Sequence, residues 1–452
     1  MNDKTRKIVI IGNGIAGVTC ARFIRKNGSK AEILIISGES EHFFSRTALM
    51  YIYMGHMKFE HIKPYEDWFW EKNDINLKKA WVETVNFQNK VIHLDSGENV
   101  AYDTLILATG SKPNKFDWPG QDLKGVQGLY SKQDLEEMEE NTREIDHAVV
   151  VGGGLIGIEM AEMLASRKIP VTFLVREKNF WDNVLPYEEA KLIGKHILEH
   201  HIDLRLETEL EEIIGDENNK VKSVTTDKGE NISCQFVGLA VGVSPNVNFL
   251  RDSGLEINRG IVIDQYFKTN QSDVYAIGDC AEFKKAPAKD RKNIEQVWYT
   301  GRMHGETLAH NLTSSSPVPY QPGIWFNSAK FFDIEYQTYG IVPTQETEEL
   351  DSFYWEHQNG KICIRLVFEK NSEKIAGVHS LGWRLRHEFF DTAVQECWTL
   401  EKVLGQLPKA DFNTEFFKKH YHEVLEKYKA ETGREIKLSK PSFLKRLIGS
   451  RL

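Results

Sequence analysis

The stretch KIVIIGNGIAGVTCARFIRKNG, residues 7–28, decides the fold class of this chain. Its first six residues, KIVIIG, form an apolar run that predicts a buried β-strand. A glycine-rich turn follows, and the segment VTCARFIRKNG predicts a helix that leads to a second strand, AEILIIS. This order of strand, glycine turn, helix and strand is typical of a dinucleotide-binding α/β unit.

Each glycine of the turn has a physical role. Gly12 permits the tight turn, Gly14 lets the backbone approach a pyrophosphate, and Gly17 lets helix and strand pack closely. The helix N-terminus, at Ile15 and Ala16, offers free N–H groups and a partial positive charge to phosphates. The turn therefore predicts a dinucleotide site.

An acidic residue and a second copy of the pattern strengthen this prediction. Glu39, just past the second strand, is placed to accept a hydrogen bond from an adenosine ribose hydroxyl. About 140 residues after the first turn, HAVVVGGGLIGIEMAEMLASRKIPVTFLVRE repeats the whole unit. A single unit occurs as a structural turn in other α/β proteins, whereas two complete units predict two bound dinucleotides. In the second turn we expect the nucleotide to contact Gly152, Gly154, Leu155, Ile156 and Gly157.

These residues resemble the pyridine nucleotide–disulfide oxidoreductase superfamily of two-dinucleotide flavoproteins. YDTLILATG, residues 102–110, is similar to the family's strand and turn where the FAD domain crosses to the NAD(P) domain. VGVSPN, residues 241–246, is similar to the return crossing, and TNQSDVYAIGDCA, residues 269–281, to the second FAD signature. The resemblance extends from residue 7 to about 310 and adds these expected cofactor contacts: Ala108, Thr109, Gly110, Gly242, Gly278 and Asp279, the last on the ribityl chain.

The resemblance implies an α/β fold with two Rossmann-like dinucleotide-binding domains and a C-terminal α+β domain. The FAD domain is expected to be discontinuous, residues 1–115 and 245–316, with the NAD(P) domain, residues 116–244, inserted. Residues 317–400 are expected to form the α+β domain, which often builds a dimer interface in the family. Residues 401–452 are expected to be a helical extension. FAD, with NADH or NADPH as co-substrate, is the implied cofactor set.

Composition narrows the class of protein. With 41% hydrophobic and 27% charged residues, the 452-residue chain has the composition of a soluble globular protein. Its net charge of −9 argues against a general nucleic-acid binder. No apolar run approaches the length of a bilayer span, and the N-terminus lacks the features of a signal peptide. The five cysteines form no CxxC pair, which favours a reducing cytoplasm and predicts no metal site.

Two residues of the second unit bear on the nicotinamide. Glu159 could serve only the helix dipole, but in the family this glutamate faces the flavin and the nicotinamide amide, often paired with a cation. Arg46 is a candidate for that cation. At the end of the unit's second strand, Val175 takes the place of the acid that selects NAD, and Arg176 the phosphate-binding place. Glu177 opposes a phosphate there, so the sequence favours NADPH only slightly.

The stretch FFSRTALMYI, residues 43–52, carries the clearest departure from disulfide reductases. Where peroxidase-like members have a single cysteine, this chain has Arg46. Ferredoxin-reductase-like members have an arginine there too, although Tyr51 replaces the lysine expected near the flavin. A guanidinium cannot store electrons, so electrons are expected to leave the flavin without a sulfur relay.

Smaller signals left alternatives open. Trp298 is expected to cover the flavin or to form core. His196, His200 and His201 fit a solvated helix face better than a metal pair, and Cys280 fits a packed small residue. The tail KLSKPSFLKRLIGSRL, residues 437–452, fits either a docked terminal helix or a weak contact with an anionic membrane surface.

The sequence therefore predicts an NAD(P)H oxidoreductase similar to rubredoxin or ferredoxin reductases and to NADH oxidases that lack the redox cysteine. Its expected partner is a small electron-carrier protein or a small oxidant, and a homodimer is also expected. The alternatives are a peripheral NADH:quinone reductase anchored by the tail and an apoptosis-inducing-factor-like interaction flavoprotein.

Overall fold

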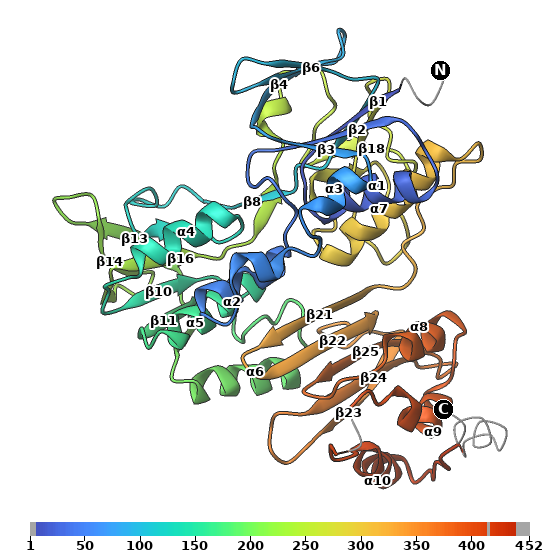
Figure 1. The fold of residues 1–452 in the computed structure, drawn as a ribbon. Coiled ribbons are helices and arrows are strands. Elements are labelled where there is room, and N and C mark those ends of the chain that lie inside the picture. The colour runs from blue at the N-terminus through green and yellow to red at the C-terminus, as the bar shows by residue number, and fades with distance from the viewer. Residues whose placement is uncertain (1–5, 414–415, 440–452) are drawn as a thin grey trace. The chain divides into compact units, whose positions relative to one another are not determined.

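The computed structural model describes residues 6–413 and 416–439. Contacts divide the chain into two units, shown in Figure 1. Unit 1 comprises the residues up to Lys178 together with His200–Pro322. Unit 2 comprises Asn179–Glu199 and the residues from Gly323 onward. Each unit is described separately below.

The first sheet of unit 1 is the five-stranded parallel sheet that the opening stretch predicted. Its strand order is β19-β7-β1-β2-β3. Ile8 of β1 lies opposite Ile33 of β2 on one side and Thr104 of β7 on the other, so both neighbours pair in parallel. The strands are nearly continuous apolar runs because both faces of the sheet are covered. Their bounds are β1 (Lys7–Ile11), β2 (Glu32–Ser37), β3 (Ile75–Lys79), β7 (Thr104–Leu107) and β19 (Val274–Ala276).

Helices α1 (Ile15–Lys26) and α7 (Trp298–Thr313) pack against each other beside this sheet (Figure 1). The remaining short elements around it follow the chain. They are η2 (Arg46–Ala48), α2 (Leu49–Tyr53), η3 (Phe59–Ile62), α3 (Trp68–Lys72), β4 (Val82–Asn86), β5 (Val91–Leu94), β6 (Asn99–Ala101), η4 (Asn248–Leu250), β18 (Ile261–Ile263), η5 (Gly278–Cys280) and β20 (Ala281–Phe283).

The second parallel sheet of unit 1 has the order β12-β11-β10-β16-β9. It contains the second glycine turn, between β10 and helix α5. Two antiparallel strands, β8 and β17, carry the chain between the two sheets, as the crossing motifs implied. The bounds are β8 (Ser111–Pro113), β9 (Val126–Gln127), α4 (Lys132–Asn141), β10 (Ala148–Val151), α5 (Leu155–Ser166), β11 (Val171–Val175), β12 (Asp203–Leu206), β13 (Leu210–Gly215), β14 (Val221–Thr226), β15 (Asn231–Ser233), β16 (Phe236–Leu239) and β17 (Val243–Pro245).

Unit 2 is built on an antiparallel sheet of order β21-β22-β25-β24-β23, which confirms the predicted C-terminal α+β fold. Helix α6, whose flanking strands β11 and β12 belong to unit 1, packs with this unit. The bounds are α6 (Tyr187–Glu199), β21 (Phe326–Phe331), β22 (Ile334–Gly340), β23 (Leu350–Glu356), β24 (Cys363–Glu369), β25 (Ile375–Leu381), α8 (His387–Gln395), α9 (Leu400–Ala410) and α10 (Tyr421–Thr432).

The predicted C-terminal extension is helical as far as the structure describes it. Val403, Leu404 and Leu407 of α9 are fully buried in the core of unit 2, and α10 follows. Most of the basic tail, from residue 440 onward, lies outside the described residues. Within the described part of the chain, no helix is long and apolar enough to cross a bilayer.

Candidate functional site

A cavity of about 650 Å³ in unit 1 collects most of the residues that the FAD motifs predicted. It lies at the carboxyl ends of the parallel strands, where α/β sheets bind ligands. Of the predicted FAD contacts, the following line the cavity: Gly12, Gly14, Ile15, Ala16, Glu39, Arg46, Ala108, Thr109, Gly110, Gly278, Asp279 and Trp298. The half-buried Trp298 therefore faces the cavity, which resolves the alternative left open by its sequence.

The first glycine turn opens the cavity toward the N-terminus of α1. Gly12 has a φ of +111°, and a Cβ atom there would lie 2.1 Å from the carbonyl oxygen of Ala108. Gly14, the N-cap of α1, has open space where a side chain would point, and no side chain caps the helix. Gly17 does not line the cavity; it packs the helix closely on the turn, as predicted. The uncapped N–H groups suit a pyrophosphate.

Arg46 lies with Glu39 at the ribose-binding end of this cavity. Its guanidinium donates to both carboxylate oxygens of Glu39, at 2.8 and 2.6 Å, and to the carbonyl oxygen of Tyr130. The backbone N–H of Lys132 also donates to Glu39. The expectation that Arg46 is the cation for Glu159 is corrected here: its bidentate partner is Glu39, because both side chains are carried by the loop that follows β2.

Asp279 is held by a small network of polar side chains. Its Oδ2 atom accepts hydrogen bonds from the Ser111 hydroxyl at 3.1 Å and from the Tyr130 hydroxyl at 3.4 Å. The side-chain amide of Gln296 donates in turn to Ser111 Oγ at 2.7 Å. Burial raises the pKa of Asp279, against the hydrogen bonds from Ser111 and Tyr130. A desolvated carboxylate with spare acceptor capacity is suited to ligand hydroxyl groups.

These features fit the parts of FAD. The turn and the N-terminus of α1 would hold the pyrophosphate, and Glu39 the adenosine ribose. Glu39 still has acceptor capacity, because a carboxylate offers about four lone-pair sites and three are used. Asp279 would hold hydroxyl groups of the ribityl chain.

The second glycine turn reproduces the first. Gly152 has a φ of +112°, and a Cβ atom there would lie 2.4 Å from the carbonyl oxygen of Ala240. Gly154 caps α5 without a side chain, so the N–H groups of the first turn at Leu155 and Ile156 are not capped by one. A Cβ atom at Gly157 would collide with the turn and with Phe173. This geometry fits the pyrophosphate of a second dinucleotide.

The other residues predicted for the nicotinamide nucleotide lie on neighbouring elements. Glu159 is half-buried on α5, and Gly242 adopts a φ of +89° before β17. Val175 is fully buried at the end of β11, whereas the Arg176 side chain is 72% exposed. Arg176 Nε donates to Glu177 Oε1 at 2.9 Å. The roles of these residues toward NAD(P)H stay predictions.

No cysteine lines the cavity. Cys280 follows Asp279 in the chain, but its thiol lies 3.4 Å from the carbonyl oxygens of Leu107 and Ile277 and is fully buried. Burial raises the pKa of this thiol. Cys280 is thus a packed residue, as predicted, and a protonated buried thiol is a poor nucleophile.

The sequence matches the family model described as pyridine nucleotide-disulphide oxidoreductase over residues 6–305. The chain belongs to this family. The assignment makes it an FAD-dependent NAD(P)H oxidoreductase and confirms the cofactors expected from the two glycine turns.

Three relatives illustrate the range of this oxidoreductase family. The chain is 31% identical to the NAD(P)H nitrite reductase of Bacillus subtilis (strain 168) over 372 residues, which cover 80% of this chain and 44% of that protein. It therefore spans less than half of that relative's length. It is 27% identical to the rubredoxin-NAD(+) reductase of Ectopseudomonas oleovorans over 321 residues, 70% of this chain and 83% of that one. The solved NAD-dependent persulfide reductase from A. fulgidus shares the fold, with a TM-score of 0.81, 22% identity and coverage of 94% of this chain and 84% of that chain.

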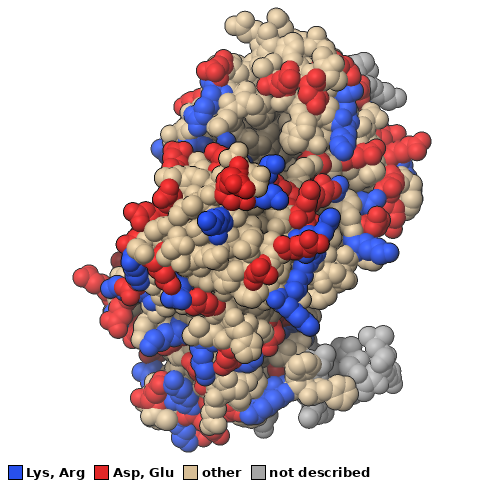
Figure 2. All heavy atoms as spheres, turned by 90° about the vertical axis from the view of Figure 1, so that its left-hand side faces the viewer, with Lys and Arg blue, Asp and Glu red and all other residues tan. Residues whose placement is uncertain are grey.

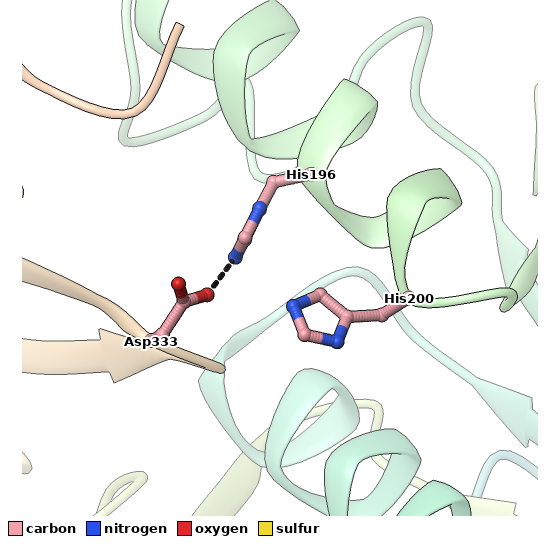
Figure 3. Close-up of side chains that lie close together, drawn as sticks. All are labelled: His196, His200 and Asp333. Atoms are coloured by element: carbon pink, nitrogen blue, oxygen red, sulfur yellow. Dashed lines mark ion pairs between the residues drawn. The ribbon is translucent and has the colours of Figure 1, made fainter. Parts of the chain in front are cut away.

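The histidines of the oxidoreductase's helix α6 differ from expectation. His196 does not lie on a solvated helix face: its side chain is 1% exposed, and its Nε2 atom lies 2.5 Å from Asp333 Oδ1 (Figure 3). Asp333 is in the turn between β21 and β22 of the same unit. The face of α6 that carries His196 is buried because the helix packs in unit 2, which the pattern of the helix alone could not indicate. Figure 3 also draws His200, just after the helix.

Several cavity residues of the oxidoreductase were missed by the sequence reasoning. They are Trp81, Ser111, Tyr130, Ser131 and Gln296. Ser131 starts a capping box with Asp134 at the beginning of α4, a local signal that could have placed this segment at a helix N-terminus. Nothing local could have shown that Tyr130 reaches Asp279, because 149 residues separate them. Tyr51, singled out at the lysine position, does not line the cavity and stacks on His56.

Proposed function

We propose that this flavoprotein takes hydride from NAD(P)H and passes electrons from the flavin directly to a small electron-carrier protein or a small oxidant. When bound, FAD supplies the change from hydride to single-electron chemistry. The protein supplies binding, orientation and exclusion of water.

One observation carries the proposal: the cavity has an arginine–glutamate pair where related disulfide-using enzymes have a redox sulfur. Arg46 and Glu39 form a bidentate ion pair, and no cysteine lines the cavity. Neither side chain can accept electrons. The route from flavin to acceptor then contains no dithiol.

The individual residues have distinct proposed roles. Asp279, oriented by Ser111 and Tyr130, fixes the ribityl chain. Glu159, on α5 beside the second turn, positions the nicotinamide amide and is the proposed catalytic-site carboxylate. Arg46 supports binding through Glu39, so its proposed role is positioning the cofactor rather than chemistry.

The relatives support a protein acceptor. A rubredoxin-NAD(+) reductase matches most of both chains, which favours a small electron carrier. A second candidate acceptor follows from the nitrite reductase, because this chain corresponds to less than half of that protein. A separate nitrite-reducing protein is therefore an alternative partner.

Three further expectations remain hypotheses. The quinone reductase alternative depends on the tail, most of which lies outside the described residues. The interaction-flavoprotein alternative predicts no turnover with any acceptor. A homodimer and a cytoplasmic location also stay predictions. On the face shown in Figure 2, acidic and basic side chains of the described residues are interspersed, in keeping with the expectation of no nucleic-acid partner.

The test is anaerobic reduction of the purified protein by NADH and by NADPH, followed by reoxidation with a panel of acceptors. The panel holds rubredoxin, ferredoxin, a nitrite reductase lacking its own flavoprotein part, quinones, disulfides and oxygen. Fast reoxidation by a one-electron carrier supports the proposal. Preference for a disulfide or a quinone contradicts it, and a protein that no acceptor reoxidises would be an interaction flavoprotein.

A further inference from the structure

Trp81 is an exposed tryptophan at the edge of the FAD cavity. It lies in the connection between β3 and β4, it is 54% exposed, and it lines the cavity together with Ala80 and Val82. Its backbone N–H donates to Asp95 Oδ1 at 3.2 Å, and its carbonyl accepts from the N–H of Asp95. The backbone is therefore fixed while much of the indole faces solvent. So large an exposed aromatic surface favours a ligand that would cover it.

The indole lies across Gly38. A Cβ atom built on Gly38 would come 2.0, 2.4 and 2.5 Å from three carbons of the Trp81 indole, Cδ2, Cε2 and Cε3. Gly38 is not among the glycines with positive φ, so its backbone does not require glycine. The missing side chain is needed for the indole to lie in this position. Gly38 and Trp81 thus form one structural feature, although 43 positions separate them.

The place of this feature identifies its ligand. Gly38 directly precedes Glu39, the acid suited to the adenosine ribose, and both line the cavity. The adenine is bonded to that ribose and must lie beside it. Within the described residues no aromatic ring is recorded as stacked on Trp81, so one face of the indole is not used for packing against another ring. Base–aromatic stacking contributes substantially to the binding of nucleotides.

We propose that Trp81, seated on Gly38, is the platform on which the adenine of FAD stacks, and that it makes the site select FAD over FMN. The inference rests on the proposed function only in that this cavity binds FAD; it is independent of the electron acceptor. FMN has no adenosine part, so it cannot use the platform.

The test measures the affinity of the flavin-depleted protein for FAD and for FMN by flavin fluorescence. We expect Trp81→Ala to weaken FAD binding at least tenfold, about 1.4 kcal/mol, and to leave FMN binding unchanged. Trp81→Phe should lie between the two. The matched control is Trp68→Ala, because Trp68 is equally exposed, at 57%, but does not line the cavity; it should change neither affinity.

A double-mutant cycle connects the glycine to the indole. Gly38→Ala should displace the indole and reproduce the loss seen in Trp81→Ala, with little further loss when both changes are combined. Equal losses for FAD and FMN, or full additivity of the two changes, would overturn the inference. So would FAD binding by Trp81→Ala that matches the wild type. A wild-type protein that binds no FAD would instead refute the proposed function itself.

Discussion

Arg46 shows how one residue acquires a role from its neighbours. Its side chain is 28% exposed, and its charge is matched by Glu39, which is 15% exposed. The guanidinium also lies 4.4 Å from the centre of the Tyr130 ring. A bidentate pair of this kind fixes the carboxylate in one orientation. The arginine therefore presents Glu39 to the ribose, and a lysine would not hold both oxygens in the same way.

The choice of nicotinamide nucleotide is tested at Arg176. If its exposed guanidinium binds the 2′-phosphate, Arg176→Ala should lower kcat/KM for NADPH at least tenfold, about 1.4 kcal/mol, and spare NADH. Glu177→Gln should raise the efficiency with NADPH, because a carboxylate 2.9 Å from Arg176 Nε competes with a phosphate. Steady-state kinetics with both nucleotides check this. Arg205→Ala, on the neighbouring strand β12, is the control, and equal losses for both nucleotides in Arg176→Ala would show another role.

His304 predicts acid sensitivity of unit 1. Its Nδ1 atom accepts a hydrogen bond from the N–H of Gly278 at 3.1 Å, and burial, with Arg291 nearby, lowers its pKa to about 3. In the unfolded chain its pKa is about 6.5. Between these values the unfolded chain binds a proton that the native state does not, so stability falls as pH falls below about 6.5.

At pH 5 the loss from this one group should be about 2 kcal/mol. His304→Asn, which keeps an acceptor for Gly278 but cannot be protonated, should lose less stability than the wild type between pH 7.5 and pH 5. Urea unfolding followed by flavin release at both pH values measures the difference. Identical pH dependence in the two proteins would contradict the neutral, buried state of His304.

Helix α6 shows the same dependence at the scale of an element. Arg365 of β24 donates to both carboxylate oxygens of Glu189 on α6, at 2.6 and 2.8 Å, and also to Glu188. Glu189 is fully buried, and Arg365 is 7% exposed. Burial alone would raise the pKa of Glu189, but His379 and Arg365 outweigh it and lower that pKa. The pair joins α6 to the sheet of unit 2.

Breaking this pair from one side should be costly. Arg365→Met leaves a buried carboxylate without its cation, which we expect to destabilise unit 2 by about 3–5 kcal/mol. The double variant Arg365→Met with Glu189→Leu should recover most of that loss. Calorimetry of the three proteins measures it, with flavin content as a check that unit 1 is intact. Arg434→Met, whose pair with Glu373 is exposed, should cost less than about 1 kcal/mol; a similar cost for both arginines would argue against the buried pair.

At the scale of the whole molecule, the arrangement of sulfur bears on how many electrons the protein holds. All five cysteines are free; four are buried, and Cys397, the exposed one, belongs to unit 2. Burial raises the pKa of Cys20, Cys234 and Cys280 in unit 1. No thiol of the flavin unit is therefore placed to store electrons.

Anaerobic titration should accordingly consume one two-electron equivalent per FAD, with no long-wavelength charge-transfer band from a thiolate. Thiol counting with a chromogenic reagent under denaturing conditions, before and after reduction, provides the control and should give the same number. Two equivalents per FAD, or new thiols after reduction, would reveal a disulfide and contradict direct transfer from flavin to acceptor.

The sequence by itself determined the local units of this protein. The two glycine turns, their strands and helices, and Asp279 of the second FAD signature are encoded by residues close together in the chain, because period and turn geometry are local properties. These signals were sufficient to predict two parallel sheets, the antiparallel C-terminal sheet and most of the residues that line the cavity.

Only the tertiary structure decided which distant residues meet. Trp81 reaches Gly38, Tyr130 reaches Asp279, and Arg46 turns to Glu39 rather than Glu159. Helix α6, whose pattern fits either unit, has its buried face set by the sheet it packs on. The physical reason is that side-chain partners depend on how sheets and loops pack, and the hydrophobic pattern of each element specifies that it has a buried face but not which neighbour covers it.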